Sequence, residues 1–397
     1  MIEGKDIIIV GQQPWDVEIG SNCKNIAIEF SKNNRVLYVN APLDRISLMR
    51  GGNDEKIKKR KDIVDGKASG LLKIADNLWN LYPDSMIESI NWIGIHSIFK
   101  MLNKVNNRRF ANSIQKAIDA LGFRDFILFN DNDMFRSFHL KEMLKPALYV
   151  YYSRDYMLAV DYWKKHGEKL EPQLIASSDI CVANSTYLAD YCRQFNPNSY
   201  YVGQGCELDL FMDFNGEAPE DMKKINGVKI GYVGALLGLR LDMGILTEIA
   251  SKRPEWQLVL VGPEDELFKG SELHQFPNVH FLGSKSPLHL PAYIHSFDIC
   301  LNPQVISQVT IGNYPRKIDE YLVMGKPVIA TSTPFMEAIF NKHTYLAKNP
   351  ADYIRLIEVA LQEDNKERQE ERRRFAAEHT WENSVAEIYH AIEKHWN

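Results

Sequence analysis

The sequence predicts an α/β protein made of two doubly wound, Rossmann-like domains that face each other across a cleft. Short apolar runs, such as residues 7–10 and 258–261, alternate with helix-length segments along the chain. Continuous apolar runs of this kind are typical of parallel strands covered by helices on both faces. The 397 residues exceed the usual size of one domain, and a weakly periodic stretch at residues 205–226 separates two series of such runs.

The order of the elements sets the expected boundaries. We expect the first domain at residues 1–206 and the second at 207–379, with a charged C-terminal helix at about 380–397 that packs back onto the first domain. The expected strands begin near Ile7, Val36, Leu78, Phe126, Leu148, Ile180 and Tyr201 in the first domain, and near Lys229, Leu258, Val279, Ile299, Val328 and Tyr345 in the second.

Composition excludes several classes of protein. With 45% hydrophobic and 25% charged residues the chain is an ordinary globular protein, and its net charge of −5 argues against a nucleic-acid partner. No apolar run reaches membrane-spanning length. The five cysteines are scattered without a Cys-x-x-Cys pair, and the chain runs directly into a strand without a signal peptide. We therefore expect a cytoplasmic protein.

Residues 312–331 carry the most informative pattern. Pro315 suits the first position of a helix, and Gly325 suits the left-handed residue that ends it. Arg316 and Lys317 then lie in the first turn, where the helix dipole is already positive. Cations there are unfavourable unless an anion binds, and a phosphate group would suit both the cations and the free backbone N–H groups.

Residues 229–242 show a similar pattern at another strand end, with a cation close to the N-terminus of a helix. Gly234 allows a ligand to approach the backbone closely, Arg240 stands before the next helix, and Asp242 suits its N-cap. Two cations at two helix N-termini on one sheet edge suit a diphosphate. The alternative interpretation is a glycine turn with a solvated arginine.

Together with residues 257–264, 277–284 and 290–303, these two segments resemble the nucleotide-sugar half of GT-B fold glycosyltransferases, especially family 4, also called group 1. The resemblance is specific across residues 229–331 and extends upstream through residues 174–185 and 205–211. It implies a hexosyltransferase that uses a nucleoside-diphosphate sugar, with UDP favoured over GDP by its frequency in the family.

The resemblance also implies residue roles. Arg240 and Lys317 match the cations that hold the diphosphate, and Glu320 matches the acid that accepts hydrogen bonds from the ribose. The donor-binding residues it implies are Gly234, Arg240, Gly283, Ser284, Asn313, Tyr314, Pro315, Lys317 and Glu320. One position departs from the family, because Gly312 stands where a second glutamate normally contacts the donor sugar. The sugar, and the retaining outcome that the resemblance implies, therefore stay open.

The expected chemistry requires no cofactor beyond the substrate. Arg240 and Lys317 would stabilise the leaving diphosphate in a water-poor site, so we expect metal-independent transfer. The nearest approach to a metal-binding Asp-x-Asp motif is Asn130-Asp131-Asn132-Asp133, which we interpret as a solvated helix cap.

The first domain should bind the acceptor. The loop at residues 11–20 offers Trp15 as a platform for a sugar ring, with Asp16 and Glu18 as carboxylates. A packed loop tryptophan is the alternative. Arg154 and Asp155 follow another strand, where the family often has a histidine-containing turn. Arg154 is a candidate acceptor contact and Asp155 a candidate catalytic base, beside Arg240 and Lys317 as catalytic cations.

A mixed apolar and basic segment at residues 87–109, with the cluster Lys56–Lys61, suits an anionic membrane surface. The alternative is a half-buried helix beside a solvated loop. A lipid-linked or glycan acceptor at the inner face of the membrane would fit the synthesis of a cell-surface polysaccharide. Two other functions stay open: a nucleotide-sugar epimerase of the same fold, and a non-catalytic sugar-nucleotide binder in which Gly312 marks lost activity.

Overall fold

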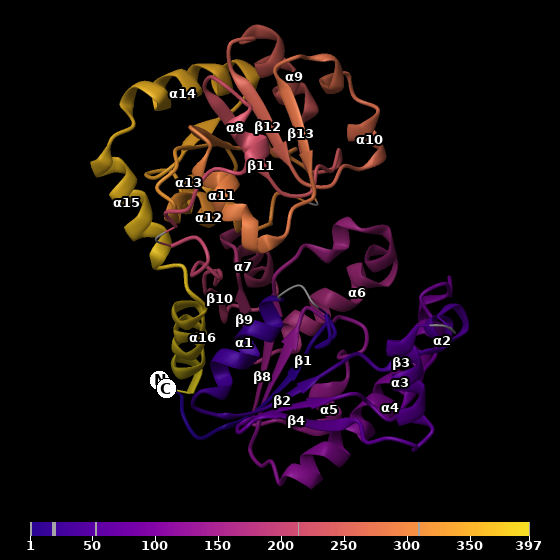
Figure 1. Cartoon of the computed structure of the whole chain (residues 1–397). Coiled ribbons are helices and arrows are strands. Elements are labelled where there is room, and N and C mark those ends of the chain that lie inside the picture. Colours follow the sequence, from indigo (N-terminus) through magenta and orange to yellow (C-terminus); the bar gives the residue numbers. More distant parts are fainter. Residues whose placement is uncertain (1, 18–20, 52–53, 213, 309, 397) are drawn as a thin grey trace. The chain divides into compact units, whose positions relative to one another are not determined.

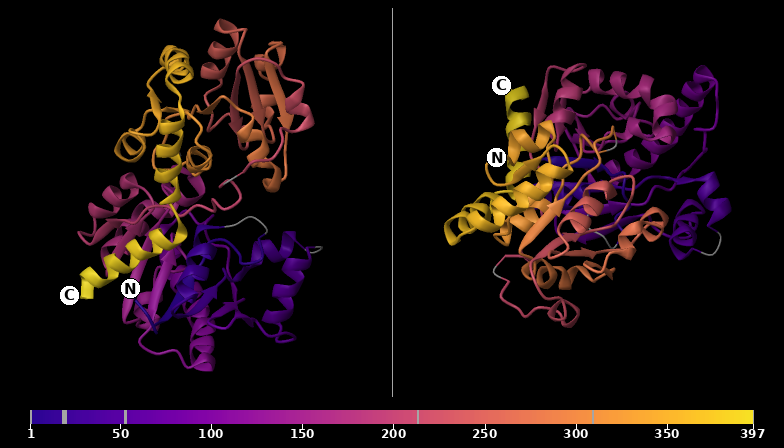
Figure 2. Two further views of the ribbon diagram at one scale, coloured as in Figure 1. Left: turned by 60° about the vertical axis from the view of Figure 1, so that its left-hand side comes forward. Right: turned by 90° about the horizontal axis from the view of Figure 1, so that it is seen from above.

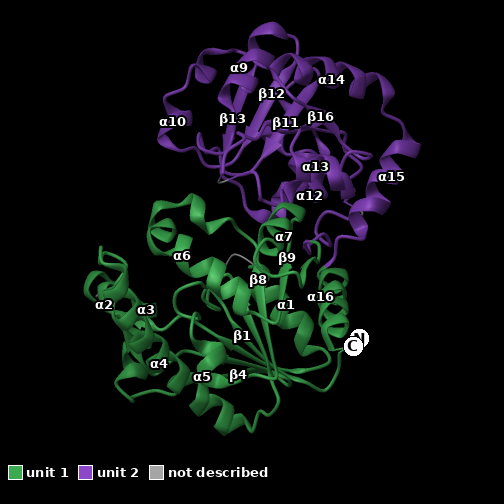
Figure 3. Cartoon of the chain, turned by 180° about the vertical axis from the view of Figure 1, so that it is seen from behind, with its two compact units in different colours: residues 1–203, 381–397 green, residues 204–380 purple. Residues whose placement is uncertain are grey.

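The computed structural model describes residues 2–17, 21–51, 54–212, 214–308 and 310–396. The chain divides into two compact units, coloured separately in Figure 3. Unit 1 comprises Met1–Gly203 with Trp381–Asn397, and unit 2 comprises Gln204–Thr380. The sequence-based boundaries after residues 206 and 379 lie close to these. Each unit is built on a sheet of parallel strands packed with helices (Figure 1), so the predicted fold class is confirmed.

Unit 1 is built on an eight-stranded sheet with the order β10-β9-β8-β7-β1-β2-β5-β4. All neighbours are parallel except β4 and β5, which form an antiparallel edge. The sheet strands are β1 Asp6–Val10, β2 Arg35–Val39, β4 Leu71–Ala75, β5 Leu78–Leu81, β7 Ile127–Asp131, β8 Leu148–Ser153, β9 Ile180–Ala183 and β10 Ser199–Tyr201. A separate two-stranded sheet pairs β3 Leu43–Asp44 with β6 Met86–Ile87.

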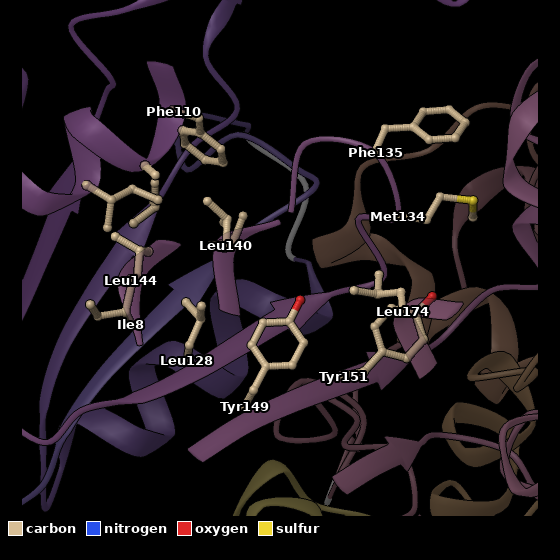
Figure 4. Packing of buried hydrophobic residues seen from close by; sticks show 14 of the residues in the cluster. Ile8, Phe110, Leu128, Met134, Phe135, Leu140, Leu144, Tyr149, Tyr151 and Leu174 are labelled. Atoms are coloured by element: carbon tan, nitrogen blue, oxygen red, sulfur yellow. The ribbon is translucent and has the colours of Figure 1, made fainter. Parts of the chain in front are cut away.

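Helices cover both faces of this sheet because successive strand residues point to opposite sides. The helices of unit 1 are α1 Asn22–Ser31, α2 Arg45–Arg50, α3 Glu55–Val64, α4 His96–Leu121, α5 Leu140–Leu144, α6 Asp161–Ser177, α7 Thr186–Arg193 and α16 Trp381–Trp396. On one face, Ile8, Leu128 and Tyr149 pack against Phe110 of α4 and Leu140 of α5 (Figure 4).

The opposite face is covered by α1 and by the C-terminal helix α16, which lie side by side. Phe30 stacks on Tyr389 with ring centroids 5.4 Å apart, and the Asn34 side chain donates a hydrogen bond of 2.9 Å to the Tyr389 hydroxyl. The two ends of the chain also lie in this unit (Figure 2). Near them, Lys5 Nζ lies 5.4 Å from a Trp396 ring centroid. The last helix therefore belongs to the core of unit 1.

Unit 2 has six parallel strands in the order β13-β12-β11-β14-β15-β16. Counted within the unit, this is the 3-2-1-4-5-6 order of doubly wound folds, in which ligands bind where the order reverses, between β11 and β14. The strands are β11 Lys229–Val233, β12 Gln257–Val261, β13 Val279–Gly283, β14 Ile299–Asn302, β15 Val328–Thr331 and β16 Tyr345–Ala347. The helices are α8 Glu220–Lys223, α9 Met243–Lys252, α10 Glu266–Lys269, α11 Leu290–His295, α12 Lys317–Val323, α13 Pro334–Ile339, α14 Pro350–Glu363 and α15 Lys366–Ala377.

Helix α12 ends as predicted but begins later. Gly325 has a left-handed φ of 75°, and the N–H groups of Gly325 and Lys326 bond to the carbonyls of Leu322 and Tyr321, which is a Schellman cap. At the other end Arg316 is the N-cap. Pro315 therefore precedes the helix rather than occupying its first position.

No helix in the described ranges is long and apolar enough to cross a membrane. All five cysteines are buried and free.

Candidate functional site

The carboxyl ends of the unit 2 strands form an edge shaped by glycines. Gly234 follows β11 with a φ of 139°, and Gly262 follows β12 with a φ of 154°. A Cβ atom at Gly262 would overlap the carbonyl oxygen of Gly234, so the two strand ends pack backbone to backbone. Gly283 ends β13 with a φ of 69°, and Ser284 beside it is exposed. Three neighbouring strands thus end at glycines with positive φ angles.

Lys317, the first residue of α12, reaches back to the end of β11. Its Nζ donates a hydrogen bond of 2.5 Å to the Tyr232 hydroxyl and lies 4.3 Å from the centroid of that ring. A Cβ atom at Gly234 would be 2.8 Å from the same Nζ. No described carboxylate pairs with Lys317. The structure therefore brings Gly234 and Lys317 together and leaves the ammonium charge without a counter-ion.

Arg240 lies in the loop between β11 and α9. Its side chain is exposed, and it forms no ion pair with the residues that the structure describes. Its backbone carbonyl accepts from Val305 N–H at 2.9 Å, and Asp242 N–H donates to the Pro303 carbonyl at 2.9 Å. The loops after β11 and β14 are therefore joined, and they carry Arg240 at the reversal of strand order.

Glu320 is the third charged group without a partner. Its carboxyl group is half-buried on α12 and has no hydrogen-bond donor among the described side chains and backbone groups. Burial raises the pKa of Glu320, although the charges of Arg316 and Lys317 oppose that rise. A desolvated acceptor of this kind is suited to a hydroxyl donor on a ligand.

Hydrogen bonds to residues of unit 2 hold the loop that precedes α12. Asn313 N–H bonds to the Thr310 carbonyl at 3.1 Å. The Tyr314 side chain turns inward and donates to Asp319 at 2.8 Å, while Gly312 is buried. The Tyr314 side chain thus anchors the loop.

Sequence reasoning missed two partners in this site. Asp319 binds His379 with 2.6 Å between Oδ1 and Nδ1, although the two are 60 residues apart in the sequence. Tyr232 beneath Lys317 was also missed. No local motif links either pair, so only the tertiary structure identifies them.

In unit 1, the predicted site residues Arg154 and Asp155 pair with each other, and Arg154 also pairs with Asp131. Arg154 Nε lies 2.7 Å from Asp131 Oδ1, and its Nη1 lies 2.9 Å from Asp155 Oδ2. Burial alone lowers the pKa of Arg154, but Asp131 and Asp155 raise it overall. Gln12 N–H closes the network by donating to Asp131 at 3.2 Å.

The interpretation of residues 130–133 as a solvated cap is wrong. Asp131 and Asp133 are fully buried, because both carboxylates are satisfied within the protein. Asp133 accepts from Phe135 N–H and Arg136 N–H at 3.1 and 2.9 Å and pairs with Arg136 Nε at 2.6 Å. The segment is the buried end of β7 and the turn that follows it.

Trp15 and Asp16 have separate partners. The Trp15 ring is half-buried, packs edge-on against Tyr38 with centroids 5.1 Å apart, and has Lys24 Nζ 5.1 Å from its centroid. Asp16 lies 3.3 Å from Arg60. Glu18 and Gly20 of the same loop lie outside the described residues.

Comparison with known proteins defines the class. Residues 227–363 match the family described as "Glycosyl transferases group 1". A sucrose-phosphate synthase from Thermosynechococcus elongatus has the same fold, with a TM-score of 0.66, 13% identity and 99% of both chains covered. HepE from Anabaena in complex with UDP gives a TM-score of 0.62 at 12% identity and covers 98% of this chain and 100% of that one. At these identities the structures show the fold alone.

The doubly wound units and these matches define a GT-B fold protein. The region that matches the group 1 glycosyltransferases lies within unit 2. Among curated relatives, a Bacillus subtilis (strain 168) protein named as the teichuronic acid biosynthesis glycosyltransferase TuaH is 28% identical over 254 residues. That match covers 60% of this chain and 63% of TuaH, less than two thirds of its length.

Proposed function

We propose that this protein transfers a sugar from a UDP-sugar to a glycan or lipid-linked acceptor in the synthesis of a cell-surface polysaccharide. The observation that carries the proposal is that Lys317, Arg240 and Glu320 lie at one sheet edge and form no ion pair with the described residues. The name of TuaH, which refers to teichuronic acid biosynthesis, supports the pathway class, and the UDP complex of HepE supports the nucleotide.

The chemistry follows from these charges. The acceptor oxygen forms a bond to the anomeric carbon of the sugar while the bond from that carbon to the diphosphate breaks. Lys317 and Arg240 stabilise the negative charge that develops on the leaving UDP, a role that a divalent cation fills in other enzymes. Glu320 accepts hydrogen bonds from the ribose. We propose that transfer is metal-independent and retaining.

We assign the acceptor to unit 1. A cavity of about 700 Å³ there is lined by, among others, Trp92, Asn103, Arg136 and Tyr162, and it offers aromatic surfaces and polar groups together. Asp155, whose side chain is 46% exposed, remains our candidate for the group that takes the proton of the acceptor hydroxyl.

Donor binding tests the proposal most directly. Lys317→Ala should weaken UDP binding about 100-fold, which corresponds to one charge-assisted contact with a phosphate. Lys252→Ala is the matched control, because this exposed lysine ends α9 and pairs with Glu248. Isothermal titration calorimetry of both variants gives the two affinities. Unchanged UDP affinity in the Lys317 variant would refute the site.

Turnover separates the proposal from its rivals. The wild-type protein is incubated with a panel of nucleotide sugars, and products are followed by NMR. Slow hydrolysis of one donor, or transfer to an added glycan, supports a transferase, and the anomeric configuration of the product decides between retention and inversion. Inversion at a ring carbon of the sugar without transfer would indicate an epimerase. Tight binding with no turnover would indicate a non-catalytic binder.

We also propose that unit 1 rests on an anionic membrane. Helix α4 exposes an apolar stripe of Ile98, Met101 and Val105 that continues from Ile95 before the helix. Lys100, Lys104 and Arg108 flank that stripe on the exposed side of the helix. Apolar side chains that enter a bilayer beside cations that meet anionic head groups are characteristic of interfacial helices.

Vesicle sedimentation tests the membrane proposal. The protein should sediment with vesicles that contain phosphatidylglycerol and remain free with pure phosphatidylcholine. Met101→Glu should abolish this binding, whereas Leu267→Glu, an exposed apolar residue of unit 2, should leave it intact. Equal loss in both variants, or no binding by the wild type, would contradict the proposal. It would also be contradicted if the wild-type protein were a dimer that Met101→Glu dissociates, because the stripe would then be a dimer interface.

A further inference from the structure

Next to the loop at residues 313–315, which we call the donor loop, unit 2 contains a cluster of four side chains centred on Asp319. His379 Nδ1 lies 2.6 Å from its Oδ1 atom. The Tyr314 hydroxyl donates to its Oδ2 atom at 2.8 Å, and the Cys206 thiol donates to the same oxygen at 3.3 Å. Asp319 is fully buried, so these three donors replace the water that a carboxylate would otherwise bind.

The cluster joins segments that are distant in sequence. Tyr314 belongs to the loop before α12, and Asp319 belongs to α12 itself, two residues after Lys317 and one before Glu320. Cys206 and His379 lie where the chain enters and leaves unit 2, and Cys206 N–H bonds to the His379 carbonyl at 2.9 Å. One carboxylate therefore connects the donor loop, the helix that carries two donor residues, and both ends of the unit.

The ring and the hydroxyl of Tyr314 make different contacts. The ring lies against Phe335 and Phe340, with centroids 5.4 and 5.7 Å away. These contacts do not depend on the hydroxyl group. They hold the ring in the core, whereas the hydrogen bond to Asp319 fixes the loop relative to α12.

We propose that Asp319, Tyr314 and His379 are positioning residues for the donor nucleotide. They hold the loop at residues 313–315 and helix α12 in one arrangement, in which Lys317, Glu320 and the loop backbone meet the same nucleotide. This inference rests on the proposed function, because it assigns the cluster to the donor site. None of the three side chains needs to touch the ligand.

Matched substitutions test this role without removing the buried carboxylate. Tyr314→Phe keeps the ring and removes the hydroxyl, and it should weaken UDP binding about fivefold, the affinity equivalent of one hydrogen bond. His379→Leu should weaken it by a similar factor. His379→Asn places an amide N–H where Nδ1 lies, and it should restore affinity to within about twofold of the wild type.

Circular dichroism melts of each variant test whether folding is retained. The double variant with Tyr314→Phe and His379→Leu should bind UDP no more weakly than about the worse single variant, because both act on one carboxylate. The positioning role is overturned if folded Tyr314→Phe and His379→Leu bind UDP like the wild type, or if His379→Asn is as impaired as His379→Leu. Failure of the wild type itself to bind UDP would instead refute the proposed function.

Discussion

Where the strand order reverses at the carboxyl edge of the sheet, the described charged side chains are paired with one another in unit 1 but not in unit 2. In unit 1 the strand order reverses between β1 and β7, and there Gln12 donates to Asp131 while Asp131 pairs with Arg154. In unit 2 the order reverses between β11 and β14, beside Lys317, whose ammonium group bonds to the phenol of Tyr232 and pairs with no described carboxylate. The same topology thus gives one edge whose charges are neutralised and one whose charges are not.

This difference separates structural charges from ligand-binding ones. A buried ion pair satisfies itself and needs no ligand, and breaking it leaves an uncompensated charge inside the protein. An ammonium group or a desolvated carboxyl without a partner is stabilised when a ligand supplies one. Substitution at the unit 1 edge should therefore lower folding stability, whereas substitution at the unit 2 edge should lower affinity.

The largest effect is expected for Arg154→Met. This variant leaves Asp131 buried without its cation, and it should lower the free energy of unfolding by about 3–5 kcal/mol. Urea unfolding followed by tryptophan fluorescence reports on unit 1, because every tryptophan except Trp256 lies within it. Lys317→Met is the matched control and should change the unfolding free energy by less than about 0.5 kcal/mol.

If the two variants unfold at the same urea concentration, the contrast between the edges is wrong. A normal midpoint for Arg154→Met with weakened acceptor transfer would instead make Arg154 an acceptor contact.

The second-largest effect is expected for Glu171, a buried carboxyl of unit 1 that forms no ion pair in the described part of the chain. The hydroxyls of Tyr151 and Tyr191 donate to it at 2.7 and 3.1 Å. Burial raises the pKa of Glu171 from its ordinary value of 4.5 to about 7, although these hydrogen bonds oppose the rise. The folded state therefore keeps a proton that the unfolded state loses between these two pH values. Its contribution to stability is complete below pH 4.5 and is lost as the pH rises through 7, at a cost of about 3 kcal/mol.

Glu171→Gln removes this titration. The variant should be more stable than the wild type at pH 8.5 by about 2 kcal/mol, and the difference should vanish near pH 5. Urea midpoints measured across this range give the difference directly. Glu168→Gln, an exposed neighbour on α6, should follow the wild type at every pH. A pH-independent difference for Glu171→Gln would show that this carboxyl does not titrate in the range.

The sequence was sufficient for the parts of this structure that depend on local patterns. The apolar runs that became β1 and β12 and the left-handed Gly325 follow from spacing and turn chemistry. Such features require no knowledge of which distant side chains meet.

The parts that the sequence could not predict depend on long-range contacts. Asp319 and His379 look like solvated residues until the fold buries Asp319 and pairs it with the partly exposed His379. Residues 130–133 look like a cap until Arg154 and Arg136 pair with their carboxylates. The antiparallel edge strand β4 was missed because Lys73 interrupts its apolar residues and the last three residues of the strand are exposed.

The smallest of these effects is expected for Glu320→Gln, which tests whether Glu320 contacts the ribose or the diphosphate of UDP. Glu320→Gln preserves size but removes the carboxylate that we assign to the ribose, so it should weaken UDP binding about tenfold. The affinity for pyrophosphate, which has no ribose, should stay unchanged in calorimetry. In the wild type, UDP that lacks both ribose hydroxyls should bind about as weakly as UDP binds to the variant. Equal losses for UDP and pyrophosphate would mean that the substitution acts through Lys317, one helical turn away, and that the ribose assignment is wrong.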